Sequence, residues 1–235
     1  MKKFKTFIAL DLKSNTKNIS IVKKLHNHVC GFKVGYRSFY NKRSGELISE
    51  IKKKKSKLFL DLKLHDIPNT VKSAIDSLSN INPDFLTLHI SGGNEMMKAA
   101  AKSIKKNKLK TKILCVTLLT SLDGKDSEKI YKERNTNKLV KKFAEIANNV
   151  NIHGIICSGD DLKVLRKYNK LIKITPGVKM FAKNDDQKRV TFVHNALQDG
   201  ANFVVIGREL IESKKPLDLL KKYGEQHKNK NLWTK

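Results

Sequence analysis

Three charged residues interrupt an otherwise apolar stretch of the sequence, LFLDLKLHDIPNT, which runs from Leu58 to Thr70. They are Asp61, Lys63 and Asp66. Because alternate residues of a strand share a face, we expect Asp61 and Lys63 to point to the same side. An ammonium held between carboxylates can deliver a proton to a carbon that develops carbanion character. The stretch therefore predicts proton-transfer chemistry at the end of a strand.

The same charges have an alternative interpretation as a structural network of ion pairs. Burying an ion pair is costly, and apolar replacements are often equally stable, so such a network is weak evidence for stability. Lys33 closes the strand-like segment before this one, and it would extend the array to Lys–Asp–Lys–Asp if consecutive strands are neighbours. We therefore favour a prearranged electrostatic field around a proton donor.

Eight apolar, strand-like segments alternate with amphipathic stretches, and this alternation must position those charges. Strands that alternate with helices indicate right-handed crossovers and a parallel sheet. Eight such units without a linker predict a closed (β/α)8 barrel, with residues 1–235 as one catalytic domain; the alternative is a doubly wound open sheet. The predicted strands span residues 7–12, 31–35, 58–64, 85–90, 112–119, 153–158, 171–178 and 203–208, and helical patterns cover 71–78, 95–104, 139–150 and 161–168.

Polar residues close most of these strands, which is where a barrel carries its chemistry. Pro68 restricts Ile67 to an extended conformation and is expected to open the next helix, so that Asp66 lies in the turn above the barrel mouth. The strand-end residues are Asp11, Lys33, Asp61, Lys63, His89, Thr120, Ser121 and Arg208.

The formal net charge of +27 invites a nucleic-acid-binding interpretation. However, only six of the 49 basic residues are arginine, the lysines are spread along the whole chain, and aromatic residues make up 7%. Clustered Arg and Lys with interleaved aromatics would be needed for such a protein. We interpret the charge as solvated lysine faces produced by biased codon usage, and we expect no specific nucleic-acid partner.

Cysteine and histidine usage indicates neither disulfides nor a metal centre. Cys30, Cys115 and Cys157 are scattered in apolar segments, as expected of buried thiols in a reducing cytoplasm. The seven histidines show no HxxxH spacing. The chain has no apolar run near the ~20 residues that a membrane span needs, and its first apolar patch is too short for a signal peptide. We therefore expect a cytoplasmic protein with no membrane partner.

The block DLKLHDIPNT closely resembles the DxKxxDIPNT signature of the orotidine 5′-monophosphate decarboxylase family. The resemblance implies a (β/α)8 barrel, a homodimer, and conversion of orotidine 5′-monophosphate to uridine 5′-monophosphate and carbon dioxide, with no cofactor and no metal. Further blocks resemble the family in the same order: ALD (9–11), FKVG (32–35), HISGG (89–93), VTLLTS (116–121), TPGV (175–178), DQKR (186–189) and VVIGR (204–208).

The resemblance assigns the catalytic array to Lys33, Asp61, Lys63 and Asp66. Lys63 would protonate C6 of the pyrimidine, Asp61 would sit beside the departing carboxylate, and Asp66 would reach the partner subunit's site. The remaining substrate-binding positions are Asp11 and Thr70 at the ribose, Ile67 in the shared segment, Thr120 at the ligand and Ser121 at the base.

The last two strand ends imply a phosphate-binding site, since barrels often bind phosphate with the loops after strands seven and eight. Gly207 would let backbone N–H groups approach the anion, and Arg208 would supply a bidentate fork. Gln187 matches the family glutamine of the phosphate-closing loop. The chain departs from the family at Lys179, where arginine is usual, and lysine keeps the charge but loses the fork.

The closest rival functions use the same barrel. A 3-keto-gulonate-6-phosphate decarboxylase or a hexulose-phosphate synthase also carries DxKxxD, but needs magnesium and usually has an acidic residue at the position of Lys33. An ammonium there would repel the metal. The IPNT sequence after Asp66 also favours the nucleotide decarboxylase.

Overall fold

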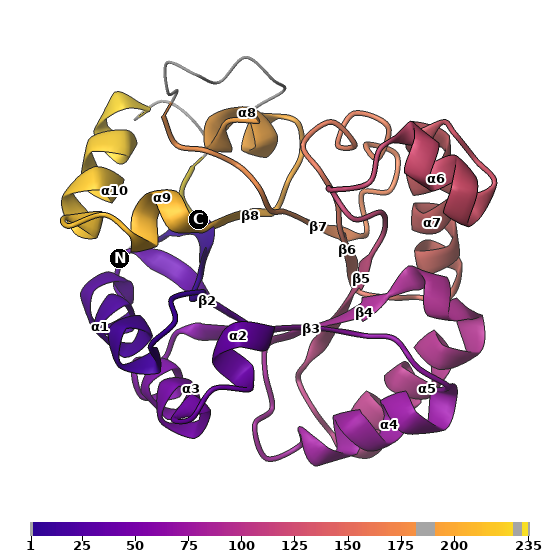
Figure 1. Ribbon diagram of the computed structural model, residues 1–235, viewed down its shortest axis with the longest axis horizontal. Coiled ribbons are helices and arrows are strands. Elements are labelled where there is room, and N and C mark those ends of the chain that lie inside the picture. The colour runs from indigo at the N-terminus through magenta and orange to yellow at the C-terminus, as the bar shows by residue number, and fades with distance from the viewer. Residues whose placement is uncertain (1, 182–190, 228–231, 235) are drawn as a thin grey trace. The chain divides into compact units, whose positions relative to one another are not determined.

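A computed structural model describes residues 2–181, 191–227 and 232–234. Over these residues eight parallel strands form a closed barrel in sequence order (Figure 1). This confirms the predicted (β/α)8 class and excludes the open sheet. The strands are β1 (Phe4–Ala9), β2 (Val29–Gly35), β3 (Lys57–Leu64), β4 (Phe85–His89), β5 (Lys112–Val116), β6 (Gly154–Ile156), β7 (Ile172–Thr175) and β8 (Phe203–Ile206).

Helices separate the strands, as the alternation of the sequence predicted. Pro68 is the first residue of its helix, which confirms its expected role, because proline lacks the N–H that a first-turn residue leaves unpaired. The helices are α1 (Asn15–Leu25), α2 (Tyr36–Phe39), α3 (Ser44–Lys53), α4 (Pro68–Ser77), the 3-10 helix η1 (Ile90–Gly92), α5 (Gly93–Lys106), α6 (Gly124–Tyr131), α7 (Thr136–Asn149), α8 (Val193–Gln198), α9 (Arg208–Ile211) and α10 (Pro216–Gln226).

Two strand ends differ from the prediction in a way that moves candidate site residues. β1 ends at Ala9, so Asp11 follows the strand instead of closing it. β5 ends at Val116, where its neighbour β6 ends at the paired residue Ile156, and only Thr117 still bonds the Ile156 carbonyl through its N–H at 3.3 Å and its hydroxyl at 2.9 Å among the contacts beyond the paired residues of these two strands. Thr120 and Ser121 therefore lie in the exposed loop after β5.

The chain divides into two compact units, one of residues 1–61 with 175–235 and one of residues 62–174. The boundary falls within β3. The prediction of a single domain over residues 1–235 is not tested by this division and stays a prediction.

In the first unit, aromatic rings fill the space between strands and join the two terminal segments. The ring of Phe7, which is fully buried, contacts Phe59 and Phe203 edge-on at centroid distances of 5.6 and 5.4 Å. Trp233, for which the sequence suggested no role, packs its ring 4.0 Å from that of Phe4. An antiparallel backbone bridge between the same two residues also fastens the segment around Trp233 to β1.

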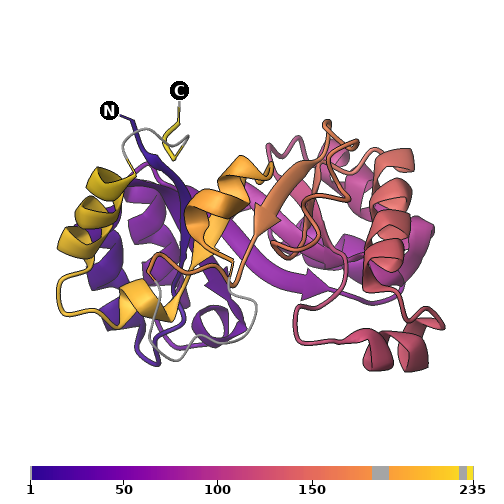
Figure 2. The same cartoon turned by 90° about the horizontal axis from the view of Figure 1, so that it is seen from above.

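In the second unit, α6 and α7 lie side by side (Figure 2), and the rings of Tyr131 and Phe143 contact each other between them at 5.5 Å. The prediction of a helix over residues 161–168 is wrong, because this segment forms successive turns. Its backbone bonds mostly join residues three apart, as in Leu162 to Gly159 and Tyr168 to Leu165. The apolar spacing that suggested a helix is satisfied by these turns, which bury Leu162 and Leu165 completely.

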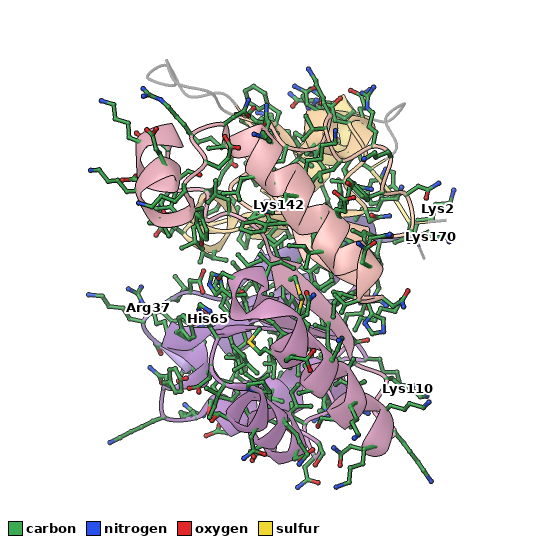
Figure 3. The ribbon with its side chains drawn as sticks, turned by 90° about the vertical axis from the view of Figure 1, so that its right-hand side faces the viewer. Lys2, Arg37, His65, Lys110, Lys142 and Lys170 are labelled. Atoms are coloured by element: carbon green, nitrogen blue, oxygen red, sulfur yellow. The ribbon has the colours of Figure 1, made fainter. Side chains whose placement is uncertain are left out.

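Lysine side chains extend into solvent from both units. Lys2, Lys110, Lys142 and Lys170 are exposed, and in Figure 3 the side chains of Lys2 and Lys110 extend away from the ribbon. The three cysteines are buried, as predicted. Among the described helices, none is long and apolar enough to cross a membrane.

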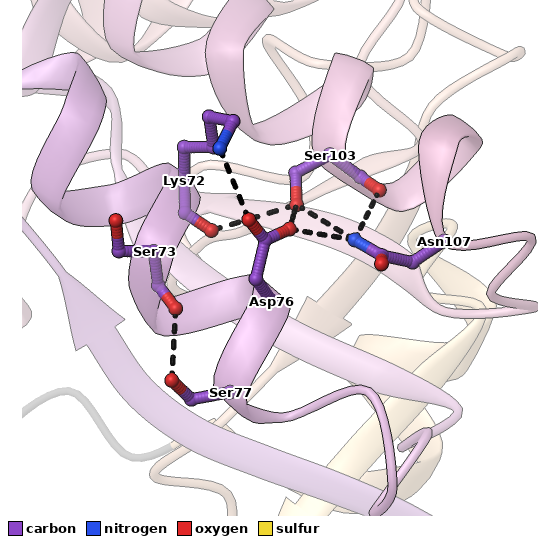
Figure 4. A network of polar contacts seen from close by, with 6 residues as sticks. All are labelled: Lys72, Ser73, Asp76, Ser77, Ser103 and Asn107. Atoms are coloured by element: carbon purple, nitrogen blue, oxygen red, sulfur yellow. Dashed lines mark hydrogen bonds and ion pairs between the residues drawn. The ribbon is translucent and has the colours of Figure 1, made fainter.

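A polar network fastens α4 to α5 in the second unit (Figure 4). The carboxylate of Asp76 on α4 accepts hydrogen bonds from the Ser103 hydroxyl and the Asn107 amide, both at 2.6 Å, and from the Lys72 ammonium at 3.1 Å. The Ser103 bond first, then those from Lys72 and Asn107, lower the pKa of Asp76 from 3.8 to about 2. The network therefore prefers the ionised carboxylate.

We expect Asp76→Asn to lower the free energy of unfolding at neutral pH. Because the folded-state pKa is below the unfolded one, the stabilisation is complete above about pH 4 and is lost as the pH falls toward 2. The gap between wild type and variant should therefore close over that window in urea titrations at several pH values. Glu145→Gln, on the exposed face of α7, is the matched control. A gap that is independent of pH would contradict the assignment.

Candidate active site

The ammonium of Lys33 lies between two carboxylates in the first unit. Its Nζ is 3.1 Å from Oδ2 of Asp61 and 3.9 Å from Oδ2 of Asp11. The side chains of Lys33 and Asp61 are each 12% exposed, whereas that of Asp11 is 44% exposed. Parallel pairing explains the approach, since Ala9 of β1 is opposite Lys33, and Gly35 of β2 is opposite Asp61. Three of the predicted site residues are thus brought together.

Gly35 keeps open the space beside this cluster. A Cβ atom at residue 35 would lie 3.4 Å from Lys33 Nζ and 3.6 Å from Asp11 Oδ1. A Cβ atom would thus be in van der Waals contact with both charged groups, and Gly35 leaves that space free. Partial burial and the nearby charge of Asp61 raise the pKa of the Tyr36 phenol, so the negative potential extends to the next residue.

Buried polar residues that the sequence analysis missed hold the chain on both sides of Asp11. The Asn18 side chain accepts from the Leu12 N–H at 3.3 Å and donates to the Leu12 carbonyl at 3.3 Å. The Ser38 hydroxyl donates to the carbonyl of Leu10 and accepts from the Asn18 amide at 3.0 Å. Asn18 is fully buried and Ser38 is 1% exposed. The position of Asp11 is therefore set by groups from α1 and α2.

Lys63, in the second unit, has a backbone conformation that is rare for a residue with a side chain. Its φ angle is +42°, in the left-handed region, where a side chain costs about 1–2 kcal/mol. The Lys63 N–H donates to the Thr87 hydroxyl at 2.8 Å, and Thr87 is completely buried on β4. The rule that alternate side chains of a strand point to the same face holds for extended backbone, and Lys63 departs from that conformation. The expectation that Lys63 shares a face with Asp61 therefore stays a prediction.

The segment after Lys63 is exposed from His65 to Thr70 and includes Ile67, which is 66% exposed. The Asp66 carboxylate accepts the N–H of Ile67 at 2.7 Å, which fixes the turn before α4. The rings of His65 and His89 lie 5.3 Å apart and so join the segment after β3 to the end of β4.

The residues expected to bind the phosphate lie in the first unit, after β7 and β8. Lys179 is half-buried, Gly207 precedes α9 and Arg208 is its exposed first residue. Gly177, in the same loop as Lys179, has a φ angle of +72°, which favours glycine. Gln187 lies outside the described residues. No group of three or more His, Cys, Asp or Glu that could hold a metal ion occurs in the described part of the chain.

The closed barrel, with charged and polar groups at its strand ends, defines the chain as an enzyme of the (β/α)8 class. The chain belongs to the orotidine 5′-phosphate decarboxylase / HUMPS family, whose model matches residues 5–223.

Two curated relatives, both named orotidine 5′-phosphate decarboxylase, match nearly full length. The one from Wolbachia sp. subsp. Brugia malayi is 37% identical, over 88% of this chain and 92% of its own. The one from Wigglesworthia glossinidia brevipalpis is 37% identical, over 94% of this chain and 97% of its own. A crystal structure of orotidine 5′-phosphate decarboxylase from Lactobacillus acidophilus is 26% identical and superposes with a TM-score of 0.78, covering 96% of this chain and 99% of that one.

We expect Thr87→Val to release the backbone of Lys63. The substitution keeps the side-chain size but removes the acceptor of the Lys63 N–H, so the free energy of unfolding should fall by about 1 kcal/mol. Amide hydrogen exchange at Lys63, followed by NMR, should accelerate. Thr6→Val is the control, since Thr6 is a buried threonine of β1 with hydroxyl contacts at 3.3 Å. Unchanged exchange at Lys63 would show that Thr87 does not hold it.

Proposed function

We propose that the chain catalyses the decarboxylation of orotidine 5′-monophosphate to uridine 5′-monophosphate and carbon dioxide, a step of de novo pyrimidine biosynthesis, without a cofactor. The observation that carries the proposal is the Lys33–Asp61 ion pair at the strand ends, within the charge array of the family signature. The names of the relatives and of the crystal structure support the same reaction.

In the proposed mechanism Lys63 is the acid and Asp61 faces the departing carboxylate. The C6–carboxylate bond breaks, its electron pair stays on C6, and the Lys63 ammonium donates a proton to that carbon. The resulting amine regains its proton from solvent. The positive charge of Lys63 favours the developing carbanion, and we regard this stabilisation as the main contribution to the rate.

Repulsion between Asp61 and the substrate carboxylate is a second contribution. Two unit charges ~4 Å apart repel by about 4 kcal/mol at an effective dielectric of 20, and this repulsion disappears when carbon dioxide leaves. Lys33 holds Asp61 at 3.1 Å and so orients the carboxylate.

Lys33 also argues against the metal-dependent members of the family. The family name covers more than one reaction, so the fold alone does not choose between them. An ammonium 3.1 Å from Asp61 and 3.9 Å from Asp11 occupies the place where a cation would meet these carboxylates. We therefore propose no metal for this site.

The remaining predicted residues receive substrate-binding roles in the proposal. Asp11 and Thr70 contact the ribose, Ile67 lines the shared segment, Thr120 contacts the ligand, and Ser121 addresses the base. The phosphate is held by Lys179, Gln187, Gly207 and Arg208.

We further propose a homodimer in which Asp66 and Thr70 enter the partner subunit's site. Residues 65–70 are exposed, so Asp66 and Thr70 are accessible to a second chain, as this arrangement requires. Stacked Tyr36 and Tyr40, exposed by 47% and 76%, give the first unit an apolar surface of its own. The proposal includes a cytoplasmic location, a single domain and no specific nucleic-acid partner.

The purified protein should consume orotidine 5′-monophosphate, measured by its loss of absorbance, with undiminished rate in the presence of a chelator. Lys63→Ala should lower kcat by at least about 1000-fold, because the proton donor is lost. Lys110→Ala, an exposed lysine, should leave kcat unchanged. Absence of turnover under every condition refutes the proposed reaction, and activity that the chelator abolishes favours a metal-dependent relative.

Mixing inactive Lys63→Ala and Asp66→Ala chains should restore activity. Each heterodimer contains one site with both native residues, so random exchange should regenerate about a quarter of the wild-type sites. Subunit exchange is confirmed separately with differently tagged chains. Heterodimers that form without activity would show that Asp66 does not act in the partner's site.

A further inference from the structure

Glu209 links the loop after β7 to the turn after β8 within the first unit. It is the second residue of α9 and directly follows Arg208. Its Oε2 accepts the N–H of Met180 at 2.7 Å, and its Oε1 accepts the N–H of Phe181 at 3.0 Å. One carboxylate therefore binds two successive backbone amides of the other loop, and such charge-assisted bonds are stronger than neutral ones.

The loop segment that Glu209 binds is also held from its other side. The Lys179 N–H donates to the Thr191 carbonyl at 3.0 Å, and the Lys179 carbonyl accepts the N–H of Val193 at 3.0 Å. The side chain of Met180, which follows Lys179, is buried, with 2% exposure. The backbone from Lys179 to Phe181 is thus bonded at two places, to residues 191 and 193 at the start of α8 and to Glu209 on α9. Removing the Glu209 carboxylate removes the second of these attachments.

The surroundings of Glu209 are rigid and partly apolar. The ring of Phe181 meets that of Tyr223 edge-on at 5.4 Å, and Tyr223 is fully buried. The Tyr223 hydroxyl accepts the N–H of His194 at 3.0 Å. Burial, with a contribution from the charge of Glu209, raises the pKa of Tyr223 to about 12. The carboxylate therefore acts from the edge of a packed cluster and not from a freely moving surface side chain.

We propose that Glu209 is a positioning residue for the phosphate of the substrate, which fixes Lys179 relative to Arg208. The inference rests on the proposed function, which assigns Lys179 and Arg208 to the phosphate. Lysine presents a single ammonium on a long flexible stem and lacks the pre-organised fork of arginine, so the side chain itself sets less of the contact geometry with an anion. A carboxylate that holds this backbone compensates for the lysine at position 179.

The sign of the effect separates positioning from simple electrostatics. Glu209 is negative and adjacent to a residue assigned to a phosphate dianion, so neutralising it would strengthen phosphate binding if only charge mattered. If positioning matters more, neutralising it weakens binding. Glu209→Ala loses both accepting oxygens, whereas Glu209→Gln keeps one oxygen and turns the other into a donor that faces an N–H. We therefore expect graded losses, larger for alanine.

The test compares uridine 5′-monophosphate with uridine as ligands, by calorimetry on the full chain. For Glu209→Ala, the Kd of uridine 5′-monophosphate should rise by about 10-fold and that of uridine should stay within about 2-fold. The KM of orotidine 5′-monophosphate should rise in parallel. Glu209→Gln should give an intermediate rise. Glu212→Ala, an equal loss of charge at the exposed end of α9, should not weaken phosphate-dependent binding.

Every outcome of the test is informative. A phosphate-dependent loss for both Glu209 variants supports the inference, and thermal unfolding confirms that the variants are folded. Unchanged or tighter binding of uridine 5′-monophosphate overturns it, as does an equal loss with uridine. If Glu209→Ala does not fold, the result for Glu209→Gln decides alone. A wild-type chain that neither decarboxylates nor binds the nucleotide overturns the proposed function as well, which distinguishes the two failures.

Discussion

The ion pair between Lys33 and Asp61 is the constraint around which the strand ends of the first unit are arranged. Charges with 12% exposure are tolerated at a barrel rim only when a partner is within bonding distance, and Asp61 supplies it at 3.1 Å. With Asp11 at 3.9 Å, two carboxylates flank the Lys33 ammonium. The Asp61 carboxylate that this ammonium positions can repel the carboxylate of a bound substrate, which is the property that the proposed decarboxylation uses.

Three of the segments that carry proposed site residues are held by a polar side chain from another helix or strand. Asn18 fixes the loop of Asp11, Thr87 fixes the backbone of Lys63, and Glu209 fixes the loop after β7. All three residues bond to backbone atoms and not to one another's side chains. The precision of the proposed site therefore comes from backbone restraint, since a flexible lysine or aspartate is placed only as well as its Cα atom.

The sequence predicted the fold well because a barrel strand is encoded locally, as a short apolar run. All eight predicted strands overlap observed ones, and Pro68 opens its helix as expected. The end of β5 was mispredicted because it depends on the length of its neighbour β6, and the segment 161–168 because its apolar spacing fits turns as well as a helix. The supports of Asp11 and Lys63 were not predictable, since no local pattern encodes a hydrogen bond between residues on different elements. The roles of the site residues remain proposals that rest on motif matches.

The two terminal segments meet in the first unit, where Phe4 packs on Trp233 and the Lys5 N–H bonds the Leu232 carbonyl. β1 pairs on one side with β2 and on the other with β8, which is encoded almost two hundred residues later, from Thr6 to Val204. During synthesis on the ribosome, the edge of β1 that pairs with β8 therefore stays open until β8 has been made. Such long-range closure slows folding. An unpaired strand edge is also prone to aggregation, and the nascent chain carries that risk until β8 covers it.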